Sequence, residues 1–494
     1  MRMRSRTDLI RGHLRMALTM LLLCAALPAL GSNAEAAADS PIISNPPTVG
    51  APIIFEFQEI AQVGYEQTEF FLSGNAHSYS PAVPLSLSQN GKFTVAADAT
   101  TAPYTTRVVV DRPIDPSRFN GTVWVEWLNV SGGVDAGPDW TLAHNEAVRE
   151  GAVWVGASAQ EVGLDALKGS LTGNPTRYAS LSHPGDSYSY DMFSQAGQAL
   201  RDNAATLLGG LVPQRIVAIG ESQSAIRLTS YVDAVHPLVN VYDGFLIHSR
   251  FAQGADLQQP PLTSIPVPNP TVIRDDLNVP VLVFETEFDT FASNLGARQP
   301  DTDRFRLWEV AGTSHFDLYG LGVGLTDIGN GQGAVEILAA MLNPPDGVGA
   351  IQCDKPINTG PMHWVLDDAV FSLDRWIKEG TPPPVAARLQ TLGSAPVVFA
   401  TDANGNVLGG IRTPQVDAPV ATLSGIGNTG AGFCFLFGLT VPFSPAQLNA
   451  LYKDHGQFAS KWGQAAHDAV KAGFLIQADA VELLKAAAKS QIGK

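Results

Sequence analysis

The sequence contains a serine with a small residue two positions before it and another two positions after it, at 220–224 (Gly-Glu-Ser-Gln-Ser). A serine hydroxyl is a weak nucleophile at neutral pH, and it becomes effective when a histidine accepts its proton and a carboxylate orients that histidine. A sharp turn between a strand and a helix exposes such a serine, and it needs small neighbours because backbone segments approach closely there. The pattern makes Ser222 a candidate nucleophile, with Ser224 in place of the usual second glycine.

Two later segments supply the partners that Ser222 requires. Residues 285–289 (Glu-Thr-Glu-Phe-Asp) follow one apolar run, and residues 311–315 (Ala-Gly-Thr-Ser-His) follow the next. The order serine, acid, histidine is expected when the serine lies on a strand-to-helix turn of an α/β sheet. His315 is therefore the predicted base. Asp289 is the preferred acid because it lies a few residues past the strand, where a loop can turn it toward the histidine; Glu287 is the alternative.

Acyl transfer to serine also requires two backbone N–H donors for the oxyanion of the transition state. One donor is expected from Gln223, the residue after the nucleophile, and the other from the loop after an early strand. Residues 129–133 (Asn-Val-Ser-Gly-Gly) are that loop's candidate, with Asn129 or Val130 as the donor.

The elements that must position these residues form an alternating pattern of strands and helices. Runs rich in β-branched and aromatic residues predict buried parallel strands at 122–128, 152–155, 215–219, 244–247, 281–284 and 305–310. Helical composition follows at 190–203 and 223–234. The predicted fold is α/β, a mostly parallel central sheet flanked by helices. The Pro-rich segment 251–278 is predicted to be an insertion over one face, where a lid would lie.

The chain beyond His315 is longer than such a core needs. It is expected to contain a helix at 364–378, a hairpin with its turn at Asn404–Gly405 after residues 397–400, and helices from Pro445 onward. The predicted organisation is a signal peptide (1–38) and one domain (39–494), with a core at about 50–320 and a C-terminal extension at about 321–494. Residues 402–406 resemble the start of a calcium loop, but Val407 and Thr413 replace its Gly and Glu, so a turn is expected.

The N-terminal residues have the pattern of a secretory signal peptide. Five arginines precede and flank an apolar run at 16–30, and small residues follow up to position 38. Cleavage near Ala36 to Ala38 would give a periplasmic or secreted protein. Cys24 follows Leu23, where a lipoprotein processing site needs a small residue, so lipidation is disfavoured. No later apolar run reaches about 18 residues, so no integral membrane association is expected.

Charge and cysteine content narrow the partners further. Without residues 1–38, which carry five Arg, one Asp and one Glu, 26 basic and 45 acidic residues remain, a net charge of −19. Such a surface should repel nucleic acid. Cys353 and Cys434 then remain, and an even number of cysteines in an exported protein predicts a disulfide, with two free buried thiols as the alternative. Neither metal-ligand spacing nor a phosphate-binding loop is present, so no metal or cofactor is expected.

These motifs together resemble a known family. Residues 125–133, 220–224, 285–289 and 311–315 resemble the bacterial "alpha/beta hydrolase domain" family, and residues 408–414, 419–425 and 443–452 resemble its C-terminal signatures. The resemblance covers nearly all of the chain after the signal peptide. It implies an α/β-hydrolase core with a family-specific C-terminal extension and an esterase-like activity, but no defined substrate.

Three functions remain open from the sequence. The leading hypothesis is hydrolysis of a small-molecule or polymeric carboxylic ester; acyl transfer through the same residues and a non-catalytic binding protein are the alternatives. Aromatic residues near the predicted loops favour a hydrophobic or aromatic ester. They are Trp127, Trp140, Tyr188, Tyr190 and Phe251. The sequence has no coiled-coil or symmetric signature that would define an oligomeric state.

Overall fold

A computed structural model describes residues 38–83 and 87–494, and these form one compact unit. The predicted signal peptide, including Cys24, lies outside the described residues except for Ala38. Within the described ranges, no helix combines the length and the hydropathy needed to cross a bilayer.

In the described part of the chain, nine strands form one sheet in the order β1-β2-β3-β5-β4-β6-β7-β8-β9. The strands are β1 (Ile42–Ser44), β2 (Tyr65–Pro81), β3 (Val95–Pro113), β4 (Thr122–Trp127), β5 (Val153–Ala157), β6 (Arg215–Glu221), β7 (Gly244–His248), β8 (Val281–Glu285) and β9 (Phe305–Glu309). Neighbouring strands from β5 to β9 pair in parallel, whereas β1, β2 and β3 are antiparallel. The predicted strands β4 to β9 and the α/β fold class are confirmed.

The order of the strands determines where a site can form. After β4 the chain places β5 on one side of β4 and β6 on the other. The connections that leave β4 and β6 therefore diverge, and a crevice opens at the carboxyl ends of these two strands. Ser222 follows β6 and residues 129–133 follow β4, so both candidate segments lie at that crevice.

Helices cover both faces of the sheet because the strand side chains alternate between two apolar cores. The helices are α2 (Pro138–Glu150), α3 (Glu161–Lys168), α4 (Ser189–Asp202), α5 (Ala204–Leu207), α6 (Gln223–Ser230), α7 (His236–Val239), α8 (Glu287–Ala292), α9 (Leu318–Leu321), α10 (Gln332–Leu342), α11 (Met362–Glu379), α12 (Pro414–Asp417), α13 (Pro445–Leu451), α14 (His455–Ala472) and α15 (Gln477–Lys489). Trp124 and Trp154 lie in the core beneath α2 and α11, whereas Val123 and Val153 lie in the core beneath α4 and α6.

The segment predicted as an insertion is irregular. Between β7 and β8 the structure assigns no helix or strand to the described residues 249–280, apart from an isolated bridge between Gln258 and Ile265. Residues 223–234 form α6 and then one wider turn of π-helix at Tyr231–Val235.

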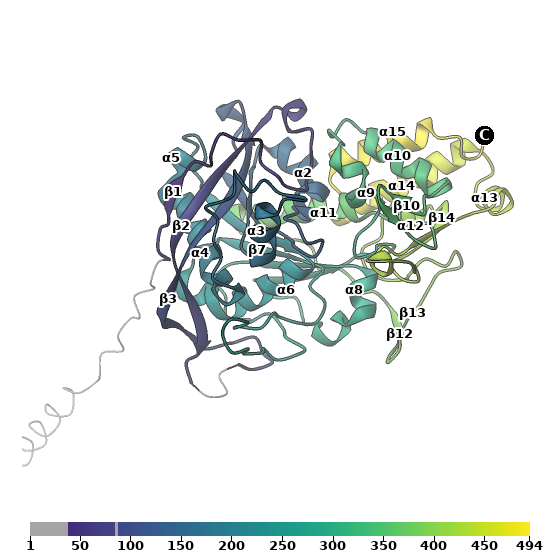
Figure 1. The fold of residues 1–494 in the computed structure, drawn as a ribbon. Coiled ribbons are helices and arrows are strands. Elements are labelled where there is room, and N and C mark those ends of the chain that lie inside the picture. Colours follow the sequence, from purple (N-terminus) through teal and green to yellow (C-terminus); the bar gives the residue numbers. More distant parts are fainter. Residues whose placement is uncertain (1–37, 84–86) are drawn as a thin grey trace, which may run out of the picture. The chain divides into compact units, whose positions relative to one another are not determined.

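The C-terminal extension differs in part from the expectation. Helix α11 packs on α2, β7 and β8, so it covers the sheet as a helix of the core would (Figure 1). The strand β13 (Val397–Phe399) pairs with the preceding β12 (Thr391–Ser394), so the expected hairpin forms only from Ala400 onward, where the Ala400 carbonyl accepts from the Leu408 amide at 2.9 Å. Asn404–Gly405 nevertheless lies in a turn, which the bridge between Thr401 and Val407 closes.

The remaining helices and two short hairpins complete the extension. Helices α10, α14 and α15 pack together (Figure 1), and the hairpins are β10 (Gly347–Val348) with β11 (Ile351–Gln352) and β14 (Ala421–Ser424) with β15 (Leu439–Pro442). The predicted disulfide between Cys353 and Cys434 is present, and it joins the end of the first hairpin to the turn η7 (Cys434–Leu436).

Candidate active site

Ser222 occupies the turn between β6 and α6. Its φ of 59° and ψ of −120° lie outside the regions that a non-glycine residue normally adopts, so its backbone is strained. The Ser222 amide donates to the carbonyl of His248 at 2.8 Å, which fixes the turn against β7. A Cβ on Gly220 would lie 3.1 Å from the Cβ of Ser224, so positions 220 and 224 require small residues.

The structure brings Ser222, His315 and Asp289 together. The Ser222 hydroxyl lies 2.7 Å from His315 Nε2, and His315 Nδ1 lies 2.6 Å from Asp289 Oδ1. His315 is 2% exposed and Asp289 is fully buried. With Nδ1 donating to the carboxylate, Nε2 is free to accept the serine proton, which is the tautomer that activates a nucleophile.

Asp289 is held as a carboxylate by its surroundings. Its Oδ2 accepts hydrogen bonds from the Thr286 amide at 2.8 Å, the Thr286 hydroxyl at 2.6 Å and the Ser249 hydroxyl at 2.7 Å. Burial alone raises the pKa of Asp289, but the nearby His315 and these hydrogen bonds outweigh burial and leave the pKa below its usual value. The local cause is a capping box at the start of α8, in which Thr286 and Asp289 bond reciprocally.

Glu287 is not in contact with His315. Its carboxylate accepts from the Gly312 amide at 2.5 Å and from the Gly425 amide at 2.8 Å. Burial raises the pKa of Glu287 to about 7. Glu287 thus links the loop that contains His315 with the C-terminal extension. Asp289 is the acid that contacts the histidine.

The two candidate oxyanion segments differ in which amides are free. The Asn129 amide donates to the Ala136 carbonyl at 2.9 Å, so Asn129 has no amide to offer a substrate. The amides of Val130 and Gln223 have no acceptor among the described residues. Of the two expected donors after β4, Val130 is therefore the one that remains.

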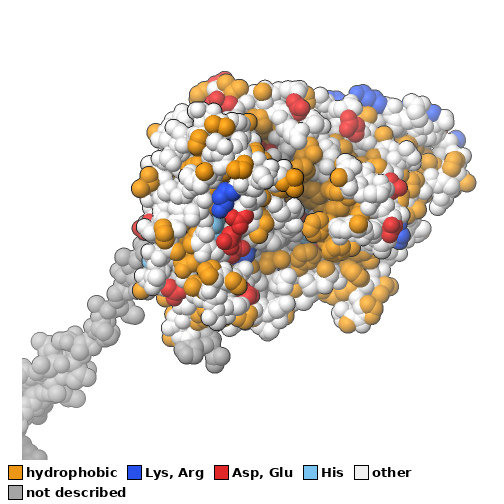
Figure 2. All heavy atoms as spheres, viewed as in Figure 1, with side chains coloured by type: hydrophobic (Ala, Val, Ile, Leu, Met, Phe, Trp, Pro, Cys, Tyr) orange, Lys and Arg blue, Asp and Glu red, His pale blue; other side chains and the backbone are white. Residues whose placement is uncertain are grey.

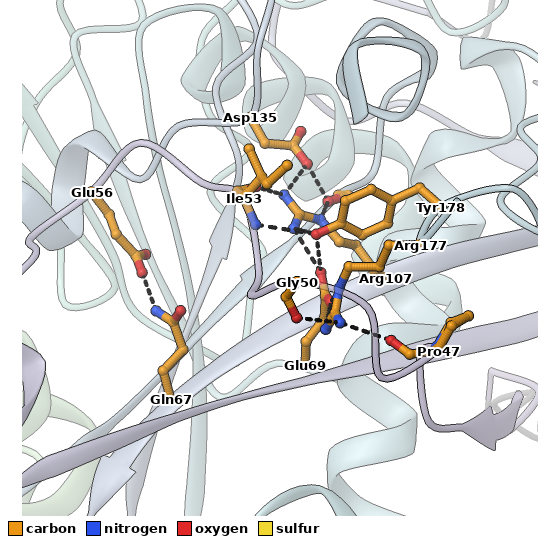
Figure 3. A network of polar contacts seen from close by, with 11 residues as sticks. Pro47, Gly50, Ile53, Glu56, Gln67, Glu69, Arg107, Asp135, Arg177 and Tyr178 are labelled. Atoms are coloured by element: carbon orange, nitrogen blue, oxygen red, sulfur yellow. Dashed lines mark hydrogen bonds and ion pairs between the residues drawn. The ribbon is translucent and has the colours of Figure 1, made fainter. Parts of the chain in front are cut away.

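A network of buried ions anchors the loop that carries Val130 (Figure 3). Asp135 near the end of this loop accepts from Arg107 on β3 at 2.8 Å and from Ser158 at 2.5 Å. The other arm of Arg107 pairs with Glu69 at 2.7 Å, and these ionised side chains are at most 1% exposed. Removal of one partner would leave a buried charge uncompensated, so the network resists displacement of the loop.

Glu221 is a site residue that the sequence reasoning missed. Its Oε1 lies 3.4 Å from His315 Nε2, and its Oε2 accepts from the Asn129 side chain at 3.1 Å. Burial, followed by the neighbouring Asp139 and Asp289, raises the pKa of Glu221 well above its usual value. Ionisation of Glu221 is disfavoured, because it would add a negative charge to a buried site that already contains the carboxyl groups of Asp139 and Asp289. Its position directly before Ser222 is the only signal in the sequence.

Most of the aromatic residues expected near the site are elsewhere. Trp127 and Tyr190 are fully buried in one core of the sheet, and Trp140 is buried in the other. Tyr188 is 8% exposed and packs in the same core as Trp127. Phe251 does reach the site: its ring stacks on the His315 imidazole with the ring centres 4.9 Å apart.

The calcium-like segment is a turn, as expected. The Asp402 carboxylate accepts from the amides of Asn404 and Asn406 within its own loop. Among the described residues, no group of three or more His, Cys, Asp and Glu side chains is arranged to hold a metal ion.

A parallel sheet, a strained serine after β6 and an acid and a histidine after β8 and β9 define the α/β-hydrolase class. A family model described as "Alpha/beta hydrolase domain" matches residues 33–485. The chain therefore belongs to this family, and the resemblance found in the sequence is confirmed. No curated protein sequence matches the chain.

Several solved structures of hydrolases resemble parts of the chain. They include a thermostable esterase from Pseudomonas putida (15% identity, 55% of this chain and 79% of the other, TM-score 0.27), an esterase from Rhizomucor miehei (13% identity, 51% and 77%, TM-score 0.26) and a serine hydrolase without a lid from Xanthomonas campestris (13% identity, 43% and 80%, TM-score 0.24). At TM-scores this low, the likenesses define no substrate.

Proposed function

We propose that the chain is a serine hydrolase that cleaves carboxylic esters through an acyl-enzyme intermediate. The observation that carries this proposal is the pair of short hydrogen bonds that links Ser222 to His315 at 2.7 Å and His315 to Asp289 at 2.6 Å. It is supported by the strained backbone of Ser222, because strain of this kind persists where a function requires the geometry.

The reaction follows from the roles that these atoms can take. Ser222 Oγ attacks the ester carbonyl carbon while His315 Nε2 takes its proton, and the Gln223 and Val130 amides bind the oxyanion. The tetrahedral intermediate collapses, the C–O bond to the alcohol breaks, and Nε2 returns the proton to the leaving alcohol oxygen. Water then attacks the acyl carbon while His315 Nε2 takes its proton. The bond between the acyl carbon and Ser222 Oγ breaks, Nε2 returns the proton to Oγ, and the carboxylic acid is released. Asp289 stays ionised and holds the Nδ1–H throughout.

The disulfide supports export. A bond between Cys353 and Cys434 persists in an oxidising compartment, and it agrees with the secretory signal expected at residues 1–38. We therefore infer that the enzyme acts in the periplasm or outside the cell.

The test is reaction of the purified protein with a fluorophosphonate probe, with p-nitrophenyl acetate hydrolysis measured in parallel. In Ser222→Ala, labelling and hydrolysis are expected to disappear together. Ser224→Ala is the matched control, because its hydroxyl lies two residues away and has no hydrogen-bond partner among the described residues; it should keep both. Absence of labelling in well-folded wild-type protein would refute the proposal. Product analysis with added alcohols separates hydrolysis from acyl transfer.

A further inference from the structure

A row of aromatic rings extends from the candidate catalytic histidine toward solvent. The Phe251 ring stacks on the His315 imidazole at 4.9 Å, with 19° between the planes. The Phe288 ring lies 5.8 Å from the imidazole, and the Phe435 ring lies 6.0 Å from Phe288. These separations are those of favourable ring pairs. We call Phe251, Phe288 and Phe435 the aromatic wall.

The outer end of the aromatic wall is open to solvent. Phe435 is 51% exposed, whereas Phe288 is 8% exposed. On the face drawn in Figure 2, hydrophobic side chains gather around the hollow in the middle of the molecule. Small-molecule sites are lined mainly by hydrophobic and aromatic side chains, and Phe435 presents such a side chain to solvent.

The inner end of the wall is held in a strained conformation. Phe251 has a φ of 61°, which a bulky residue adopts only where the surrounding structure enforces it. This backbone places the ring flat against the imidazole. Strain that places a ring on a catalytic group points to a functional position.

The C-terminal extension supplies the outer ring. Phe435 lies in η7, directly after Cys434, and the disulfide ties this turn to Cys353. The same segment contacts the histidine loop, because a Cβ on Gly438 would lie 2.7 Å from the Cβ of Ser314. The disulfide therefore restrains the segment that carries Phe435, and this segment lies against the loop that carries His315.

The chemistry of the leaving group decides which half of the ester meets the wall. His315 Nε2 must give its proton to the alcohol oxygen, so the alcohol half lies beside the imidazole. The oxyanion donors belong to the start of α6 and the loop after β4, and not to the loops that carry the three rings. A ring on the alcohol half can therefore continue the row of rings.

We propose that the aromatic wall binds the alcohol half of the substrate, that this half carries an aryl group, and that the Cys353–Cys434 disulfide positions Phe435 for this contact. The inference rests on the proposed serine esterase function. Phe435 is a specificity residue in this scheme, because it acts on the substrate at a distance from the reacting atoms.

The test compares kcat/KM for benzyl acetate and ethyl acetate, which share the acyl group and differ in the alcohol. In Phe435→Ala, the ratio of benzyl to ethyl acetate should fall about fivefold, the value of one lost ring contact, while ethyl acetate turnover stays within about twofold. Phe433→Ala is the matched control: Phe433 is 45% exposed on the same segment and makes none of the three ring contacts. Its ratio should not change.

The proposal is overturned if Phe435→Ala leaves the ratio unchanged or if Phe433→Ala lowers it equally. It is also overturned if Phe435→Ala instead lowers the ratio of kcat/KM for ethyl benzoate to that for ethyl acetate, because these two esters differ in the acyl half. Cys353→Ser with Cys434→Ser should lower the ratio as Phe435→Ala does, provided that circular dichroism shows a folded protein; a folded variant with an unchanged ratio refutes the role of the disulfide. Absence of fluorophosphonate labelling in well-folded wild-type protein would instead refute the esterase function itself.

Discussion

The substitution Asp289→Asn tests the proposed roles of the acid and the histidine most directly. Asp289 Oδ2 faces three donors, and one of them, the Thr286 backbone amide at 2.8 Å, cannot turn away. In the variant, the amide oxygen must therefore keep this side, and the NH2 group must face His315 Nδ1. The imidazole can then bond only with Nδ1 unprotonated, so Nε2 carries the proton and cannot accept one from Ser222.

The size of the effect follows from the loss of the active tautomer. An amide at the acid position of a serine, histidine and acid triad lowers kcat by about ten-thousandfold, and this corresponds to about 5.4 kcal/mol in the activation free energy. The substitution preserves shape, so the folded structure should persist. The assay is kcat and kcat/KM for p-nitrophenyl acetate at pH 8, together with the rate of fluorophosphonate labelling.

Glu287→Gln is the matched comparison, because it makes the same chemical change two residues away. The Gln oxygen can accept from only one of the Gly312 and Gly425 amides, so we expect a loss of about 1–3 kcal/mol of stability. The bond between Asp289 and His315 stays intact, so kcat should change by less than about tenfold. A folded Asp289→Asn protein that keeps a tenth of wild-type kcat, or a Glu287→Gln protein that loses as much as Asp289→Asn, would refute the assignment of Asp289 as the acid.

Two further predictions concern acidic groups whose pKa is raised by burial. Glu221→Gln should keep kcat/KM in the pH range where Glu221 is protonated, because the amide resembles the protonated acid beside His315 Nε2. Its pH–rate profile should lack the change that ionisation of Glu221 produces in wild type as pH rises, and coincident profiles would contradict this. Burial raises the pKa of Asp368 from 3.8 to about 7, so between these pH values the folded state holds a proton that the unfolded state has lost. The protonated carboxyl group therefore contributes to the free energy of unfolding at low pH, and this contribution disappears as pH rises toward 7. Urea unfolding should therefore show a smaller decrease in the free energy of unfolding between pH 5 and 8 for Asp368→Asn than for wild type, and equal decreases would refute it.

The sequence predicted the central strands because burial on both faces leaves a run rich in apolar residues. Strands β4, β6 and β8 are of this kind, with every residue buried. The β2–β3 hairpin was not predicted, because its burial has no simple period: the first half of β3 is mostly exposed, whereas residues 106–111 are all buried. Its pairing depends on contacts between strands, and no short segment carries that signal.

The site could be predicted as far as chain order determines it. Ser222, Asp289 and His315 follow three strands of one parallel sheet, so the topology alone brings them to one edge. The choice between Asn129 and Val130 was beyond the sequence, because it depends on the bridge that Asn129 forms with Ala136. The sequence contains no signal for the contact between Phe435 and Phe288, because the two residues are far apart in the chain and only the folded structure brings them together.

The C-terminal extension is part of the candidate active site and not an addition to a finished core. The loop that carries His315 begins with Gly312, and the Asn358 side chain donates to the Gly312 carbonyl at 3.1 Å. The Glu287 carboxylate accepts hydrogen bonds from both the Gly312 and the Gly425 amides, so one of its two donors belongs to the extension. A core that ended near residue 320 would leave the Glu287 carboxylate and the Gly312 carbonyl each without one partner in a buried setting, at a cost comparable to lost hydrogen bonds. The position of His315 relative to Ser222 therefore depends on segments more than 40 residues later in the chain. This dependence is a physical reason why the family match extends over nearly the whole sequence.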